Sequence, residues 1–176
     1  PFKNRITCVG VYGQNGNFTK VYRAPWDNFK KEIIDNDIYN FVAHNGKFDF
    51  KHLALNLDIR INPERWVDDT RYMAFVCTEK IDDDWLNEYE SIRKELNKSR
   101  KNQHREARYH SLKTLAPYFL GVDAFWEPDE SHDADEYVLK DCEYTYMLHK
   151  FFTKKLAALG QYEFYKNKLM PWSRMI

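Results

Sequence analysis

The chain has 176 residues and a mass of 21.3 kDa, a size that suits one domain with one hydrophobic core. Apolar residues make up 43% of it and aromatic residues 16%, which excludes an intrinsically disordered segment. Basic and acidic residues are equal in number, 27 each, which excludes a general basic surface for duplex DNA, so any nucleic acid must be bound locally.

The cysteines and the apolar runs indicate the compartment. Cys8, Cys77 and Cys142 are odd in number and show no CxxC spacing, which argues against a disulfide framework or a zinc site, and we expect buried free thiols. No run approaches the roughly 20 apolar residues of a membrane span, and residues 1–5 precede no apolar signal core. We expect a soluble, intracellular protein with no membrane partner.

The first forty residues predict a hairpin and a helix. Residues 6–12 and 18–23 have the pattern of strands, and the Gly/Asn-rich residues 13–17 between them are typical of a turn. A helix follows from residue 27, with Asp27 as its expected cap, and ends at 36–37.

The next forty residues predict an alternation of strands and helices. Residues 38–43 are an apolar run that suits a buried strand, and after the break at 44–46 residues 48–57 have helical periodicity. Residues 66–70 predict a short strand, and 71–76 a helix capped by Asp69 or Thr70. The order of elements indicates a layered α/β fold.

Residues 79–108 have a different character, with many charges and one narrow apolar stripe, and they predict a long exposed helical insertion. Its basic end, residues 98–108, either contacts a phosphate backbone or is simply a solvated face.

Two helices follow the insertion. Residues 111–120 have helical spacing and are stopped by Gly121. Asp133 and Glu136 have the spacing of a capping box, and they open a helix that runs to about Leu159 before Gly160. The expected buried face of this last helix comprises Val138, Cys142, Thr145, Leu148, Phe152 and Leu156.

The first chemical motif is His44-Asn45-Gly46-Lys47-Phe48-Asp49, where a buried strand turns into a helix. Asp49 lies between two phenylalanines in the first helical turn, at the carboxyl end of a strand, where α/β folds gather their sites. A structural alternative is that Asp49 only stabilises the helix N-terminus through the helix dipole.

The second motif is Tyr137-Val138-Leu139-Lys140-Asp141. Tyr137 and Asp141 are four residues apart, so both project from one face of the last helix. Asp141 adjoins the apolar stripe, where an unpaired charge is costly unless a metal or a donor satisfies it. The alternative is an ordinary, partly exposed pair.

Together and in this order, the two motifs resemble the second and third motifs of DEDD 3′-to-5′ exonucleases, Asn-x-x-x-(Phe/Tyr)-Asp and Tyr-x-x-x-Asp. Asp69-Thr70 and Ser111-Leu112 with Leu115 are similar to segments that lie between those motifs. The tyrosine at 137 is typical of the DEDDy subgroup, and residues 165–176 resemble the segment that joins exonuclease to polymerase in family A DNA polymerases.

This resemblance implies a ribonuclease H-like mixed sheet flanked by helices, in an exonuclease domain at 1–160 and the start of a linker at 161–176. It implies two divalent cations, Mg or Mn, with Asp49 and Asp141 supplying two of four acidic ligands. Tyr137 would orient the attacking water, and His44, Asn45 and Phe48 would contact the terminal nucleotides, Phe48 by stacking.

The first family motif, Asp-x-Glu on a strand central to the sheet, does not occur before residue 6. The chain as given is therefore expected to be defective, and the first motif to lie upstream in the parent protein or to be lost.

The resemblance implies a proofreading exonuclease that acts on the 3′ end of single-stranded DNA, with a polymerase domain in the same parent chain, in the cytoplasm of a bacterial or phage-infected cell. Two alternatives remain open. One is a ribonuclease D-like RNA exonuclease, and the other is a non-catalytic nucleic-acid-binding or scaffolding domain of the same fold.

Overall fold

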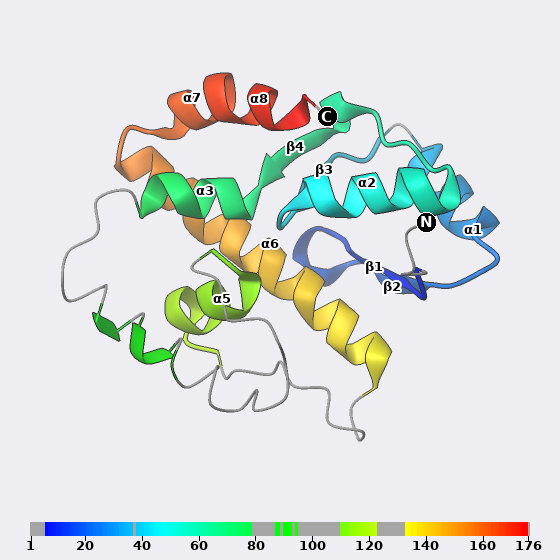
Figure 1. The fold of residues 1–176 in the computed structure, drawn as a ribbon, viewed down its shortest axis with the longest axis horizontal. Coiled ribbons are helices and arrows are strands. Elements are labelled where there is room, and N and C mark those ends of the chain that lie inside the picture. Colours follow the sequence, from blue (N-terminus) through cyan, green and yellow to red (C-terminus); the bar gives the residue numbers. More distant parts are fainter. Residues whose placement is uncertain are drawn as a thin grey trace.

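The computed structural model describes residues 6–36, 38–78, 110–122 and 133–175, together with six positions between 87 and 94. The chain is α/β, as predicted, and its strands form two separate two-stranded sheets in the described part (Figure 1). The six positions between 87 and 94 are helical, while the rest of the expected insertion at 79–108, including its basic end, lies outside the described residues.

The predicted hairpin is confirmed. Strands β1 (Val9–Tyr12) and β2 (Thr19–Tyr22) pair antiparallel around the short helix η1 (Gln14–Gly16). Gly16 has a φ of 74°, a backbone conformation that glycine adopts without steric cost, so it allows the chain to reverse here.

Helix α1 (Asp27–Phe29) continues directly into the π-helical turn η2 (Lys30–Ile34), at the place predicted for a helix. The expectation that Asp27 caps this helix was wrong, because Trp26 is the N-cap and Asp27 lies inside the first turn. Its charge can still act favourably on the helix dipole there. A core cluster forms beneath this helix from Tyr22, Phe29, Ile33, Ile34, Leu53 and Ile59.

Two parallel strands position the candidate site. Strand β3 (Phe41–Ala43) leads into α2 (Gly46–Leu57), and β4 (Trp66–Asp69), preceded by η3 (Pro63–Arg65), leads into α3 (Thr70–Cys77). Ala43 pairs with Asp69, so the carboxyl ends of both strands meet at one edge. Helices α2 and α3 therefore begin beside each other.

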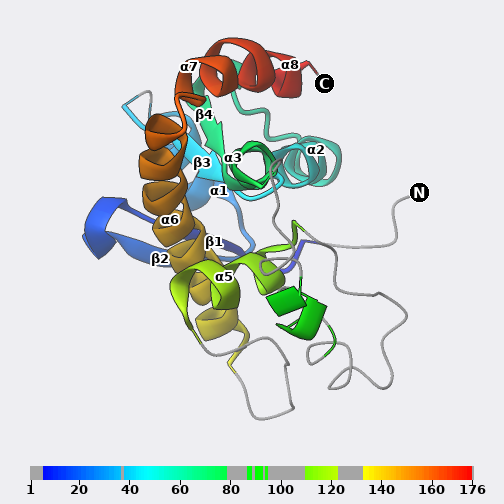
Figure 2. The same cartoon turned by 90° about the vertical axis from the view of Figure 1, so that its left-hand side faces the viewer.

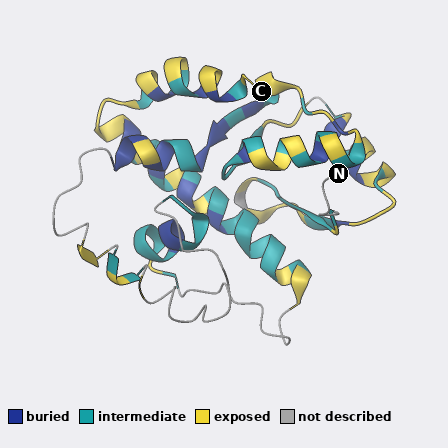
Figure 3. Cartoon of the chain, viewed as in Figure 1, coloured by how far each residue is buried: buried dark blue, intermediate teal, exposed yellow. Residues whose placement is uncertain are grey.

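Helix α6 (Ala134–Ala158) is the central support of the fold, as Figures 1 and 2 show. It packs against β1, β2 and β3, and also against α3 and α5 (Leu112–Leu120). Its buried face matches the prediction at Leu148, Phe152 and Leu156, which have no exposed surface, and Tyr144 joins them (Figure 3). Its N-cap is Asp133, which accepts a hydrogen bond from the Asp135 N–H at 2.9 Å.

The C-terminal segment expected to begin a linker is helical and contributes to the main core. It comprises α7 (Tyr162–Phe164), the π-helical turn η4 (Tyr165–Leu169) and α8 (Met170–Arg174). Tyr165 and Met170 have no exposed surface and belong to the same cluster as Trp66 and Phe152.

All three cysteines are free, as expected, with Cys77 buried and Cys8 and Cys142 partly buried. Among the described helices, none combines the length and the apolar character that a membrane crossing requires.

Candidate active site

Three carboxylates from different parts of the chain come together at the shared end of β3 and β4. Asp49 lies in the first turn of α2, Asp69 is the last residue of β4, and Asp141 is on α6. Burial, followed by the negative charges of Asp69 and Asp141, raises the pKa of Asp49 to about 7. The structure thus brings together the two predicted metal ligands and adds a third acid.

Asp49 has protein on several sides and solvent on another. The residue is exposed to solvent, yet desolvation of its carboxyl group by the surrounding protein atoms is the largest cause of its raised pKa. A carboxylate at such a boundary remains accessible to an ion or a ligand while lacking full hydration. This is the environment in which acid–base and metal-binding groups are commonly tuned.

Asp69 is fully buried and fixes the starts of two helices. Its Oδ1 accepts hydrogen bonds from the backbone N–H groups of Asn45 at 3.0 Å and Arg71 at 2.9 Å, and its Oδ2 accepts one from Gly46 at 2.8 Å. Burial nevertheless raises its pKa, in opposition to these bonds. Asp69 thereby sets the position of the segment that leads to Asp49.

Asn45 occupies the left-handed backbone region, with a φ of 65°, which asparagine tolerates better than most residues. Its side-chain Oδ1 accepts a hydrogen bond from Arg71 Nη1 at 2.8 Å. The predicted nucleotide-contacting residue is therefore held beside a guanidinium group.

His44 uses both ring nitrogens within the protein. Nδ1 lies 2.9 Å from Thr70 Oγ1, and Nε2 lies 3.0 Å from the carbonyl oxygen of His110. Burial is the main cause that lowers the pKa of His44 to about 3, so the ring is neutral at pH 7. Since a neutral imidazole has one donor, Nε2–H donates to the carbonyl and Nδ1 accepts from Thr70. His44 thus joins three segments of the fold.

Asp141 carries the least satisfied atom of the site. Its Oδ1 is buried, and no group within the described ranges donates a hydrogen bond to it. Burial raises the pKa of Asp141 to about 6, and the positive charge of Lys113 acts in the opposite direction. A buried carboxylate oxygen without a donor is costly, so a site of this kind calls for a cation or a ligand.

Tyr137 lies one turn before Asp141 on α6, as predicted, and is partly buried against the main core. The ammonium group of Lys113 lies over its ring, 5.5 Å from the centroid.

Phe48 is the exposed aromatic residue of the site. Its side chain is 58% exposed, next to Asp49 in sequence, and its ring lies 4.2 Å from that of His52. An exposed ring beside the carboxylates offers a face on which a base could stack.

The residues that could hold a metal are Asp49 and Asp141, through carboxylate oxygens of the kind that Mg²⁺ and Mn²⁺ prefer. The unpartnered Oδ1 of Asp141 fits such a role. In the part of the chain that the structure describes, no three His, Cys, Asp or Glu side chains are grouped closely enough to form a ligand set by themselves.

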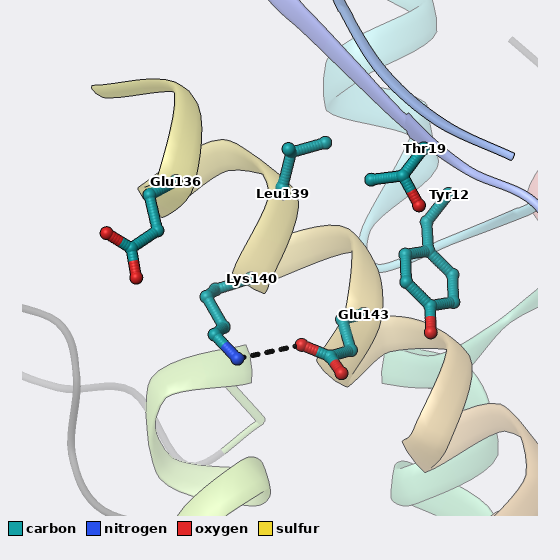
Figure 4. Close-up of a pocket in the computed structure, with 6 residues that line it drawn as sticks. All are labelled: Tyr12, Thr19, Glu136, Leu139, Lys140 and Glu143. Carbon is teal, nitrogen blue, oxygen red and sulfur yellow. Dashed lines mark hydrogen bonds and ion pairs between the residues drawn. The ribbon is translucent and has the colours of Figure 1, made fainter. Parts of the chain in front are cut away.

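A separate hollow lies between the hairpin and another face of α6 (Figure 4). Its lining residues are Tyr12, Thr19, Glu136, Leu139, Lys140 and Glu143. Lys140 and Glu143 form an ion pair in it at 3.0 Å. None of the predicted site residues lines this hollow.

Asp69, Arg71 and Lys113 were not predicted as site residues. Asp69 was interpreted as a helix cap and as part of a segment similar to one between the two family motifs, although its place at the end of a second strand parallel to β3 was a signal that it would meet Asp49. No sequence signal identifies Lys113, because its approach to Tyr137 depends on how α5 packs on α6.

Comparison with known proteins gives no matching family model, no matching curated protein and no matching solved structure.

Proposed function

We propose that the chain is part of a metal-dependent 3′-to-5′ exonuclease domain that hydrolyses the terminal phosphodiester of single-stranded DNA, as the proofreading part of a polymerase. The observation that carries the proposal is the buried, unpartnered Oδ1 of Asp141 in a cluster with Asp49 and Asp69. Carboxylates are brought together against their mutual repulsion mainly where a cation or a proton is to be bound.

In this proposal Asp49 and Asp141 hold divalent cations, which when bound supply charge that stabilises the attacking and leaving oxygens. Tyr137, one turn from Asp141, orients the attacking water through its hydroxyl group. Phe48 stacks on a terminal base, and Asn45 contacts the same nucleotide. His44 takes a different role from the one expected, since both of its nitrogens already have partners.

The sheets support a ribonuclease H-like arrangement with one strand to be added. Both sheets pack on α6, and within the described ranges β1 pairs only with β2 and β3 only with β4. A strand carrying the acidic pair of the first family motif would join the two sheets between β1 and β3. The proposed activity therefore depends on that strand.

The test is a comparison of Asp49→Asn and Asp141→Asn in a protein in which such a strand precedes residue 1. Each change removes a metal ligand, and we expect release of 3′ nucleotides from single-stranded DNA with Mg²⁺ or Mn²⁺ to fall at least about 100-fold. Thermal unfolding should show melting temperatures no lower than that of the wild type, because each variant removes a desolvated charge.

Asp58→Asn is the matched control, because Asp58 is an exposed carboxylate at the other end of α2, in a left-handed conformation that asparagine accepts. It should leave nucleotide release unchanged. Full activity of both site variants would refute the assignment of Asp49 and Asp141 as metal ligands.

A non-catalytic strand-binding domain is the second candidate, because the described residues provide two of the proposed ligands and not a full set. It predicts DNA binding without any cleavage in the parent protein. DNA and RNA oligonucleotides of identical sequence distinguish the DNA exonuclease from a ribonuclease D-like enzyme.

A further inference from the structure

We propose that the guanidinium group of Arg71 and the side-chain amide of Asn45 together bind a phosphate group of the 3′-terminal nucleotide. Arg71 is a substrate-binding residue in this proposal, and it also sets the orientation of the Asn45 amide. The inference rests on the proposed function and adds to it one residue and the chemical group that this residue recognises.

A shared carboxylate holds the two residues side by side. Asp69 Oδ1 accepts hydrogen bonds from the backbone N–H groups of Asn45 at 3.0 Å and Arg71 at 2.9 Å. Asn45 is the N-cap of α2, whose first turn contains Asp49, and Arg71 is the second residue of α3. The pair therefore lies at the edge where β3 and β4 end, beside the carboxylates of the candidate site.

The hydrogen bond between the two side chains fixes the Asn45 amide. Arg71 Nη1 lies 2.8 Å from Asn45 Oδ1. Because a guanidinium group only donates hydrogen bonds, the amide atom that faces it is the oxygen and not the nitrogen. The Asn45 amide nitrogen and the further N–H groups of Arg71 then present donors to a ligand, so the pair suits a group that accepts hydrogen bonds.

The charge of Arg71 has no ion-pair partner among the residues that the structure describes. The residue is partly buried, and within those ranges its guanidinium group donates one hydrogen bond, to the neutral amide of Asn45. Asp69, two residues earlier, uses both carboxylate oxygens for backbone N–H groups. A partly desolvated cation without an anion is costly, so an anionic ligand would complete this part of the site.

The electrostatic effects of Arg71 show on which side of the site its guanidinium group lies. Burial lowers the pKa values of His44 and His110 the most, and the positive charge of Arg71 lowers them as well. His44 comes just before the start of α2, and His110 just before the start of α5. The guanidinium group therefore lies near the place where these two helices begin.

A phosphate group has the properties that this pair requires. Its oxygens accept hydrogen bonds and carry negative charge, and a planar guanidinium group can bind two of them in parallel. The three acids of the site repel a phosphodiester, and the chain has a formal net charge of zero, so binding depends on local cations. The position of the pair next to Asp49 indicates the phosphate of the 3′-terminal nucleotide.

The experiment measures binding of a fluorescent single-stranded DNA oligonucleotide to the 176-residue chain in EDTA, over a series of salt concentrations. Loss of one phosphate contact should lower the slope of log K against log salt by about 0.7. We expect this decrease in Arg71→Gln, with about 10-fold weaker binding at low salt, because a charge-assisted hydrogen bond is lost. Arg71→Lys should keep the wild-type slope but bind less tightly, because lysine keeps the charge and lacks the planar fork.

Asn45→Asp tests the pair without changing Arg71. Aspartate tolerates the left-handed backbone conformation of this position, and its carboxylate should form an ion pair with the guanidinium group. A phosphate would then have to displace that carboxylate, so we expect weaker binding and the same decrease in slope. Far-UV circular dichroism checks that the variant is folded, and wild-type binding by the folded variant would contradict the proposal.

Arg174→Gln is the matched control, because Arg174 is also partly buried and donates a hydrogen bond, from Nε to the Trp66 carbonyl oxygen at 2.8 Å. Trp66 begins β4 and Asp69 ends it, so this arginine lies at the opposite end of the strand from the site. The variant loses the same charge and should leave affinity and slope unchanged.

An oligonucleotide with an uncharged methylphosphonate at its 3′-terminal linkage identifies the phosphate and requires no protein variant. It should lower the wild-type slope by about 0.7 and have no further effect on Arg71→Gln. Equal decreases in the two proteins would show that Arg71 does not bind this phosphate.

Three other outcomes overturn the assignment of Arg71: an unchanged slope in Arg71→Gln, equal losses in Arg71→Gln and Arg174→Gln, or no DNA binding by the wild-type chain. The proposed function is tested separately, by nucleotide release in Asp49→Asn and Asp141→Asn. Failure of the phosphate assignment is therefore distinguishable from failure of the proposed function.

Discussion

The side chain of His44 stabilises the fold through hydrogen bonds to other segments. Both ring nitrogens are hydrogen-bonded to other segments, and burial lowers its pKa to about 3. In the unfolded chain the pKa returns to about 6.5, so below that pH the unfolded state takes up a proton that the folded state does not. The contribution of His44 to stability is therefore full above pH 6.5 and is lost as the pH falls toward 3.

We predict that His44→Gln, which cannot titrate, makes the free energy of unfolding less dependent on pH. Between pH 7 and pH 5 the wild type should lose about 2 kcal/mol more than the variant. Urea unfolding at both pH values measures the difference. Other titrating groups, among them Asp49 and His110, are present in both proteins and cancel in the comparison. Parallel losses in the two proteins would contradict the buried neutral state of His44.

At the scale of elements, one side chain holds together the strand–helix junctions that build the site. Asp69 ends β4, caps α3 through Arg71 N–H, and accepts the N–H groups of Asn45 and Gly46 at the start of α2. Gly46 is also confined, since a Cβ there would lie 2.7 Å from Ala43 Cβ. Close packing and shared hydrogen bonds make the two junctions one unit.

We predict that Asp69→Ala lowers the free energy of unfolding by about 3–5 kcal/mol, because three N–H donors, in one buried and two partly buried hydrogen bonds, lose their acceptor. Asp69→Asn keeps part of the acceptor capacity and should cost less. Chemical denaturation measures both.

The control is Asp133→Ala, which removes an N-cap whose side chain accepts a hydrogen bond from Asp135 N–H, and it should cost about 1 kcal/mol. Equal losses in Asp69→Ala and Asp133→Ala would show that Asp69 acts as a simple cap.

At the scale of the molecule, the C-terminal segment is fastened to the strand end of the site. Tyr165 is fully buried, and its hydroxyl oxygen accepts the Asp69 N–H at 2.8 Å. Lys166 Nζ reaches Asp68 Oδ1 at 2.8 Å, and His149 on α6 reaches the other oxygen of the same carboxylate at 2.9 Å. These partners lower the pKa of Asp68 against the effect of its burial. Hydrogen bonds to Asp68 and Asp69 thus join residues 162–174 to the end of β4, beside the site.

We predict that Tyr165→Ala destabilises the whole chain by about 3–5 kcal/mol and Tyr165→Phe by about 1 kcal/mol, within a single unfolding transition. Calorimetry and far-UV circular dichroism, compared on the same samples, check for coincidence. Trp172→Ala, in the same segment but 65% exposed, should change stability little. A separate early transition in Tyr165→Ala would indicate that the segment beyond residue 160 folds independently.

Much of the element order could be read from the sequence. The hairpin, the short strands at 41–43 and 66–69, and the helices that begin near 46, 70, 112 and 134 all lie within residues predicted for them or a few positions away. Periodicity and turn residues are local signals, so they can be recognised in the sequence without tertiary information. The strands are shorter than predicted because pairing, which a single segment does not reveal, decides where a strand ends.

The sequence by itself determined which residues form the two motifs: Asp49 must begin a helix after a buried strand, and Tyr137 and Asp141 must share one helix face. Only the tertiary structure decided that Asp69 joins these acids, that His44 is bonded within the fold, and that Lys113 lies over Tyr137. The physical reason is the separation along the chain between the residues that interact. Motif spacing follows from the geometry of one element, whereas contacts between α2, β4, α5 and α6 depend on packing between segments up to about a hundred residues apart.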